Sequence, residues 1–352
     1  MVEQSRPVEV DVRSARADFW PRYHEFRRER QKDEHPDDPV RPDADEMRRL
    51  QYESPFQAHH YFEVSLGGKM VSWVGAETVT PASPEYPTNK HLLWAGFYVR
   101  RDHRRRGVGT SWLAILADVM DRHGCTTASM GAEEAPGHAF LRWAGAEARF
   151  SGAENRLEVA GVDWEMVRRW VEEGQTRSPS TKLEIYDGPL PESMWAEFAP
   201  QLSTMLNTIP MENLDIGDIV VTPDQMKDFY TRGEATGEVV HTALTREPDG
   251  TITAISDVNW APYRPAIIHQ QFTGVLPSAR GRGLGKWIKA AMLLHLKEVY
   301  PDMQWVSTDN AGSNAPMLGI NEKLGFKRYR SGTEYQISRD RLGARLRELG
   351  IA

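Results

Sequence analysis

The chain has 352 residues, of which 40% are hydrophobic and 26% are charged, a composition typical of a folded globular protein. Its formal net charge of −7 argues against general nucleic-acid binding, and no apolar run approaches the ~18 residues of a membrane span. The N-terminal stretch has no apolar signal core, so we expect a cytoplasmic protein, and the single cysteine, Cys125, cannot form an internal disulfide.

The first half of the chain predicts alternating strands and helices. Apolar and polar residues alternate over 8–12, which indicates a strand. Over 18–30 the aromatic residues fall on one face of a helix, which predicts a helix there. The stretch 31–46 is polar and proline-rich and predicts a surface loop. Further strands are expected at 61–66, 69–79, 92–99 and 126–131, and helices at 107–123 and 139–144.

A charged helix over 162–173 and a polar linker over 174–182 separate this pattern from a second copy. There we expect strands at 183–186, 239–246, 251–259, 267–275 and 304–308, helices at 192–206, 223–232, 316–324 and 339–349, and end strands near 326 and 335. The expected domains are therefore 1–160 and 182–352, joined by a bridging helix and linker over 161–181.

The best-defined motif lies between the strand at 267–275 and an apolar helical pattern that ends at Pro301. It is Arg-x-x-Gly-x-Gly, formed by Arg280, Gly283 and Gly285. Unblocked backbone N–H groups at a helix N-terminus bind phosphate or pyrophosphate. A nucleotide kinase would have Ser or Thr where Trp287 stands, and the glycine spacing differs from the dinucleotide-binding fingerprint.

The same motif occurs in the first half as Arg104, Gly107 and Gly109. In each copy a valine, Val99 or Val275, stands five residues before the first arginine, and a hydrophobic strand precedes the turn. The duplication predicts two tandem domains of one kind.

These motifs resemble the pyrophosphate-binding turn of the GNAT superfamily of acyl-CoA N-acyltransferases. The resemblance implies a mixed α/β (α+β) fold, in which each of two tandem domains has a splayed central sheet flanked by helices, and acetyl-CoA or another acyl-CoA as cofactor. The implied cofactor-binding residues are Val275, Arg280, Gly281, Arg282, Gly283, Leu284, Gly285 and Lys286 in the second half, and Val99, Arg104, Gly107, Val108, Gly109 and Thr110 in the first.

The segment 307–326 extends the resemblance in the second half. Asn310 and Asn314 are positioned to hydrogen-bond CoA, although capping of a helix explains such residues equally well. This segment is similar to the C-terminal halves of actinobacterial-type tandem GNAT proteins, of which the mycothiol synthases are distant relatives. The resemblance covers 181–338 well and 8–158 more loosely.

The catalytic residues are less clear. Many GNAT enzymes protonate the leaving thiolate with a Tyr where this chain has Asn321. Either Asn321 only stabilises the thiolate by a hydrogen bond, or another group, Tyr335 or water, protonates it. His269 occupies the position of a base in some family members, and Asp257 is a second candidate. In the first half the two equivalent positions are Leu141 and Leu93, which predicts that the second domain is catalytic and the first structural or cofactor-binding.

The expected function is N-acetyl transfer from acetyl-CoA to a primary amine of a small molecule. A protein amine is an alternative acceptor, and a non-catalytic acyl-CoA sensor or interaction protein is an alternative of another class. No nucleic-acid or membrane partner is expected, and the chain is a monomer or a homodimer. We expect no metal site, because His59 and His60 lack partners at useful spacing.

Overall fold

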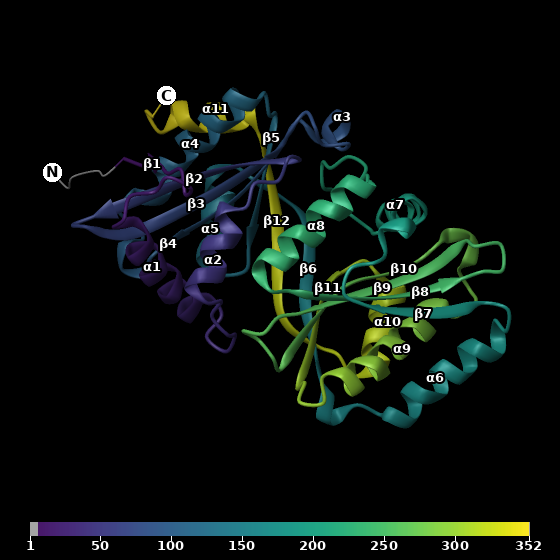
Figure 1. Ribbon diagram of the computed structural model, residues 1–352. Helices are drawn as coiled ribbons and strands as arrows, with labels where there is room; N and C mark the ends of the chain where they lie inside the picture. The colour runs from purple at the N-terminus through teal and green to yellow at the C-terminus, as the bar shows by residue number, and fades with distance from the viewer. Residues whose placement is uncertain (1–5, 352) are drawn as a thin grey trace. The chain divides into compact units, whose positions relative to one another are not determined.

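The protein is described here by a computed structural model that covers residues 6–351 (Figure 1). The chain divides into two compact units. Unit 1 comprises the residues up to Ser151, Met211–Asp218 and the residues from Gly332 onwards, and unit 2 comprises Gly152–Pro210 and Ile219–Ser331. Each unit is a mixed sheet with helices on its faces, as the sequence predicts.

The sheet of unit 1 has the strand order β1-β2-β3-β4-β5-β12. All described pairings in it are antiparallel except the parallel pair β4–β5. Its strands are β1 (Val8–Glu9), β2 (Gln57–Leu66), β3 (Lys69–Val79), β4 (Leu92–Val99), β5 (Thr127–Ala132) and the second part of β12 (Lys327–Ser338). Its helices are α1 (Phe19–Glu34), α2 (Asp43–Gln51), α3 (Tyr86–Asn89), α4 (Val108–His123), α5 (Ala135–Ala144) and α11 (Arg339–Glu348).

The sheet of unit 2 has the order β6-β11-β10-β9-β8-β7, in which β10–β11 is the parallel pair. Its strands are β6 (Glu147–Glu158, from Gly152 on), β7 (Lys182–Asp187), β8 (Val239–Arg246), β9 (Ile252–Trp260), β10 (Ile267–Val275) and β11 (Trp305–Ala311). Its helices are α6 (Trp164–Arg177), α7 (Glu192–Leu206), α8 (Pro223–Thr236), α9 (Leu284–Val299) and α10 (Ala315–Leu324).

Each unit takes one sheet strand from the other half of the sequence. In unit 1, β12 pairs with β5 from Thr333 opposite Ala132 to Ser338 opposite Thr127. In unit 2, β6 pairs with β11 from Glu158 opposite Trp305 to Gly152 opposite Ala311. The units therefore differ from the expected consecutive domains, because 152–160 falls in unit 2 and 332–351 in unit 1.

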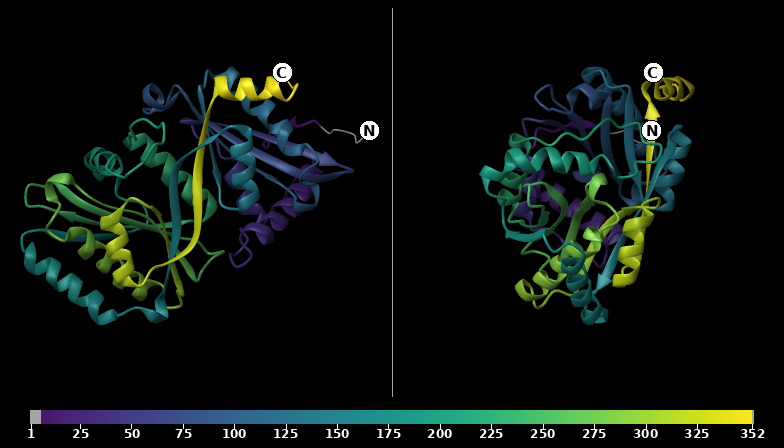
Figure 2. Two further views of the ribbon diagram at one scale, coloured as in Figure 1. Left: turned by 180° about the vertical axis from the view of Figure 1, so that it is seen from behind. Right: turned by 90° about the vertical axis from the view of Figure 1, so that its right-hand side faces the viewer.

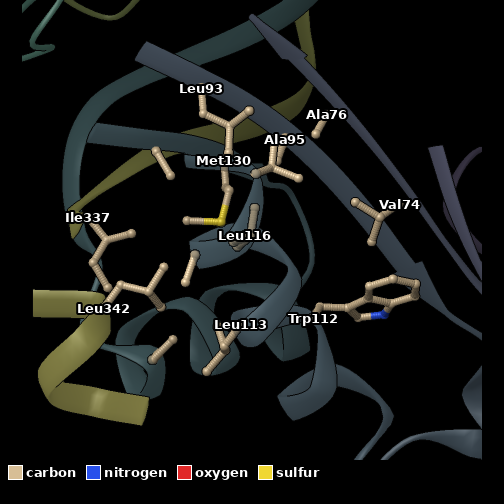
Figure 3. Close-up of a cluster of buried hydrophobic side chains, with 14 of the residues drawn as sticks. Val74, Ala76, Leu93, Ala95, Trp112, Leu113, Leu116, Met130, Ile337 and Leu342 are labelled. Carbon is tan, nitrogen blue, oxygen red and sulfur yellow. The ribbon is translucent and has the colours of Figure 1, made fainter. Parts of the chain in front are cut away.

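The core of unit 1 explains why the C-terminal segment belongs there. Figure 3 shows Ile337 and Leu342 directed into the same cluster as Leu116 and Met130 of the first half. Ile337 and Leu342 are 3% and 0% exposed. Removing such side chains from water is the main favourable term in folding. Figure 2 shows the yellow segment as a long strand that leads directly into the last helix.

The helices cover both faces of each sheet. In unit 1, α4 and α11 pack on one face and α1 on the other. In unit 2, α6 and α9 pack on one face and α7 and α8 on the other. Two expectations differ from the structure: α2 lies within and beyond the predicted loop 31–46, and α6 continues to Arg177, into the predicted linker. Within 6–351, no helix combines the length and the apolarity needed to cross a membrane.

Candidate functional site

The parallel strands β10 and β11 of unit 2 part midway along their length. Their pairing runs from Ile267 opposite Trp305 to Gln270 opposite Thr308, although β10 continues to Val275 and β11 to Ala311. On its other side β10 stays paired with β9 as far as Val275, with a β-bulge between Gln270 and Phe272. The backbone of β10 beyond the bulge therefore lacks β11 as a hydrogen-bonding partner, as the predicted splayed sheet requires.

The side chain of Gln270 holds the bulge in place. Its amide nitrogen donates to the carbonyl oxygens of Asp257, at 2.8 Å, and Phe272, at 2.9 Å, and to Ser256 Oγ, at 3.1 Å. Gln270 is 4% exposed, so these bonds satisfy backbone groups that the irregular pairing would otherwise leave buried and unpaired. Nothing in the sequence singles out Gln270, because a bulge is recognisable only once the register is known.

The turn after β10 has the backbone shape that its glycines predict. Gly281 and Gly283 have φ values of 83° and 80°, in the left-handed region that glycine adopts without strain. Gly283 is the N-cap of α9 and provides no side-chain cap. A Cβ on Gly285 would lie 3.3 Å from Val275 Cγ2, so this residue allows the helix to approach the strand closely.

The equivalent turn of unit 1 has the same shape. Gly107 caps α4 with φ 85°, and Arg105 adopts φ 62° at the position that Gly281 occupies in unit 2. A Cβ on Gly109 would meet Phe140 at 3.1 Å. Of the other residues implied here, Val108 packs against the core and Thr110 is half-buried in the first turn of α4. The parallel pairing β4–β5 also stops early, at Trp94 opposite Ser129.

The basic side chains of the unit 2 turn fall into two groups. Arg280 is exposed, whereas Arg282 forms an ion pair with Glu247 at 2.8 Å and Lys286 one with Glu173 at 2.7 Å. Two of the three cations expected to attract phosphate are therefore engaged within unit 2. In unit 1 the Arg104 Nε donates to the carbonyl oxygen of Val99 at 3.0 Å.

The asparagines of unit 2 have structural partners. Asn314 caps α10 by accepting the N–H of Met317, so its predicted alternative role as a cap is the one seen. Asn321 is 2% exposed; its Oδ1 accepts from Lys289 Nζ at 2.6 Å, and its Nδ2 donates to Asn310 Oδ1 at 2.8 Å. Burial lowers the pKa of Lys289 to about 7.

One predicted cofactor-binding residue and one predicted acid have surroundings that the sequence did not indicate. Leu284 is buried in the unit 2 core at 2% exposure, so its side chain packs rather than binds. Tyr335 belongs to unit 1, where it is 2% exposed and its hydroxyl lies 3.1 Å from His138 Nδ1. Tyr335 was a candidate proton donor for the second domain, but it lies in the sheet of unit 1. The sequence does not show that β12 pairs with β5.

The two candidate bases share one face of the unit 2 sheet. His269 lies opposite Asn259, Phe272 lies opposite Asp257, and residues two apart on β9 point the same way. Ile255, two residues before Asp257, packs in the cluster under α7 and α8. The face that carries both candidates is therefore the one covered by these helices.

The candidates differ in basicity. Burial, reinforced by Arg264, lowers the pKa of His269 to about 4, and its Nδ1 lies 2.8 Å from Ser307 Oγ. Burial raises the pKa of Asp257 to about 7. Its Oδ1 is shielded from solvent and has no hydrogen-bond partner among the described residues. A base works best when its pKa lies near the working pH, so this geometry favours Asp257 over His269.

Comparisons with known proteins agree with this architecture. Residues 20–145 match the model of the acetyltransferase (GNAT) family. The family match therefore lies in the first half of the chain, where the sequence motifs resemble the family more loosely than in the second half. Among proteins of curated function, none matches the chain.

Several solved structures share the fold. A tandem GNAT protein from the clavulanic acid biosynthesis pathway is 18% identical, with a TM-score of 0.74 over 95% of this chain and 98% of that one. A GCN5-related N-acetyltransferase from Sphaerobacter thermophilus is 11% identical, with a TM-score of 0.59 over 95% and 96%. A glucosamine N-acetyltransferase region of a fungal multi-domain β-N-acetylglucosaminidase is 14% identical, with a TM-score of 0.63 over 96% of this chain and 38% of that one.

These findings define the class of the protein. Residues 20–145 form a domain of the GNAT acetyltransferase family, and the chain as a whole has a tandem GNAT fold.

Proposed function

We propose that the protein transfers an acetyl group from acetyl-CoA to a primary amine of a small molecule, and that unit 2 carries the chemistry. The observation that carries this proposal is the carboxyl group of Asp257. Its Oδ1 is buried without a hydrogen-bond partner among the described residues, burial raises its pKa to about 7, and it lies opposite the bulge where β10 and β11 part. A buried carboxylate oxygen without a partner suits a cationic ligand such as an ammonium group.

The turn between β10 and α9 would hold the cofactor. The left-handed glycines and the start of α9 present backbone N–H groups to a pyrophosphate, and Arg280 adds a positive charge that is exposed. Acetyl-CoA supplies the acyl group as an activated thioester. The residues of this chain that contact it would be those of 280–285, together with the end of β10.

One backbone group of β10 is oriented to polarise an acyl carbonyl. The N–H of Leu276 donates to Thr253 of β9, and successive N–H groups of an extended chain point to opposite sides. The N–H of Val275 is therefore directed away from β9, to the side where the pairing with β11 has ended. Such a donor stabilises negative charge that develops on the carbonyl oxygen.

Asp257 then accounts for proton transfer. Its carboxylate binds the acceptor ammonium and takes one proton, which leaves a neutral amine. The amine nitrogen forms the new amide bond to the acyl carbon and gives up its second proton to water. The carbon–sulfur bond breaks, and the thiolate leaves with the sulfur electron pair. Asn321 is held by Lys289 and Asn310, so we assign protonation of the thiolate to water.

The buried Asn321 also favours a second function. If water does not protonate the thiolate, a protein without a side chain for this step binds acyl-CoA and does not turn it over, as a sensor does. Turnover separates the two: a sensor releases no thiol with any amine.

Calorimetric titration of acetyl-CoA into the wild type and Gly283→Trp, followed by thiol release with a panel of amines, tests the proposal. We expect binding that loses one site in the variant. We also expect turnover that falls about 100-fold or more in Asp257→Asn but changes little in His269→Gln. No acetyl-CoA binding to the wild type would refute the proposal, and full turnover by Asp257→Asn would refute the assignment of the base.

A further inference from the structure

Three side chains from three elements of unit 2 converge on one point away from the turn. Asp187 ends β7, His241 lies directly opposite it on β8, and His295 projects from α9. Asp187 Oδ1 lies 2.6 Å from His241 Nδ1 and 2.7 Å from His295 Nε2. One carboxylate oxygen and two imidazole nitrogens thus lie within 4.8 Å of one another.

We propose that Asp187, His241 and His295 bind Zn²⁺. Two imidazoles and a carboxylate are a donor set that zinc prefers, and in a tetrahedral site the three ligands leave one position for water. The carboxylate and the imidazoles now share hydrogen bonds. The metal would take the place of the hydrogens between them, and each imidazole would carry its proton on its other ring nitrogen.

The environment of His241 prepares it as a ligand. The residue is 2% exposed, and its Nε2 lies 2.8 Å from the hydroxyl of Tyr300. When the proton of Nδ1 moves to Nε2, Nε2 donates to this hydroxyl and the lone pair of Nδ1 becomes available to the metal. Tyr300 is fixed in turn by stacking on Trp260, with ring centroids 5.0 Å apart. Metal-binding histidines in proteins commonly have such a partner on the second ring nitrogen.

The site is also accessible. The Asp187 side chain is 58% exposed and that of His295 is 22% exposed, so an ion can enter from solvent without unfolding the buried His241. The expectation of no metal site overlooked this group, because its members are 54 and 108 positions apart in the sequence. Only the fold brings them together.

The position of the site assigns it a structural role. His295 is about 16 Å along α9 from the turn at the helix N-terminus, at 1.5 Å per residue. Zinc there would tie β7, the edge strand of the unit 2 sheet, and β8 to the C-terminal part of α9. The proposal is thus independent of the acyl-transfer chemistry.

The test uses the full chain without a histidine tag, freed of metal by a chelator. Zn²⁺ is titrated calorimetrically, and Co²⁺ binding is followed by the intense visible absorption of tetrahedral cobalt. We expect one equivalent of Zn²⁺ to bind and to raise the Tm. Asp187→Asn and His295→Gln, which keep size and hydrogen-bonding capacity, should each weaken binding by at least ~10-fold.

The control is His123→Gln in unit 1, where His60 and His123 form another close pair, with ring centroids 4.5 Å apart. This variant should bind zinc as the wild type does. Absence of binding by the wild type would overturn the proposal. Undiminished binding by Asp187→Asn and His295→Gln would do so as well, because the ion would then lie elsewhere.

Discussion

Replacing Lys289 by Met should stabilise the protein near neutral pH and lose that advantage in alkali. Lys289 is 3% exposed on α9, and burial alone lowers its pKa from 10.5 to about 7. Between these values the unfolded chain binds a proton that the folded chain does not. The free energy of unfolding of the wild type therefore rises with pH across this range, and methionine removes that dependence.

The size of the effect follows from the shift. Each pH unit between the two pKa values is worth about 1.4 kcal/mol, so the wild type should gain ~2.5 kcal/mol relative to Lys289→Met between pH 7.5 and 9.5. Methionine cannot donate to Asn321 Oδ1, which costs ~1–3 kcal/mol at either pH. The variant should thus be more stable by ~1–3 kcal/mol at pH 7.5 and near parity or less stable at pH 9.5.

Urea unfolding followed by tryptophan fluorescence at the two pH values measures this difference. Lys323→Met, on the exposed side of α10, is the matched control and should follow the wild type. If Lys289→Met and the wild type change in parallel with pH, Lys289 is not held neutral by burial and the reasoning fails.

Three further predictions concern the candidate site. Asp257→Asn should abolish the rise of kcat/KM through pH 7, and a pH–rate profile unchanged in shape would contradict this. The variant should also unfold at a higher urea concentration than the wild type at pH 8. The reason is that burial raises the pKa of the wild-type carboxyl, so the wild type loses folding stability as pH rises from 3.8 towards 7. Gly283→Val should lose acetyl-CoA binding in calorimetry and nearly all turnover, and Gly107→Val should spare most turnover; equal losses would refute the assignment of catalysis to unit 2. Arg280→Ala should weaken acetyl-CoA binding about 10-fold or more and leave the Tm unchanged. Arg282→Ala should lower the Tm, because it removes the ion pair with Glu247, and should have little effect on affinity. The reverse pattern would show that Arg282, and not Arg280, binds the phosphate.

The sequence was sufficient to predict the turns, because glycine spacing reports backbone shape directly. Strand, turn and helix lie at both predicted places, and Gly283 and Gly107 adopt the left-handed conformation that glycine tolerates. The end strand expected near Tyr335 is likewise present, as part of β12. The sequence could not show which sheet this strand joins, since a strand pattern fits any half-buried sheet edge.

Properties that depend on strand register and on burial could not be predicted from the sequence. The bulge at Gln270 follows from how β9 and β10 pair, and the difference between Asp257 and His269 follows from desolvation in the folded unit. Lys289 offered one signal, a lone lysine within the apolar face of α9. Its partner Asn321 could be found only in the structure.

The strand exchanged between the two halves of the sequence has a consequence for biosynthesis. As the chain emerges from the ribosome, unit 1 appears first, but its β5 edge stays unpaired until residues 333–338 have been made. Unit 2 has all of its strands earlier, since β6 precedes the rest of it. N-terminal domains usually fold first during synthesis. Here the sheet of unit 2 can be completed before the sheet of unit 1. During synthesis the open edge of β5 is the part of the nascent chain most in need of protection from aggregation.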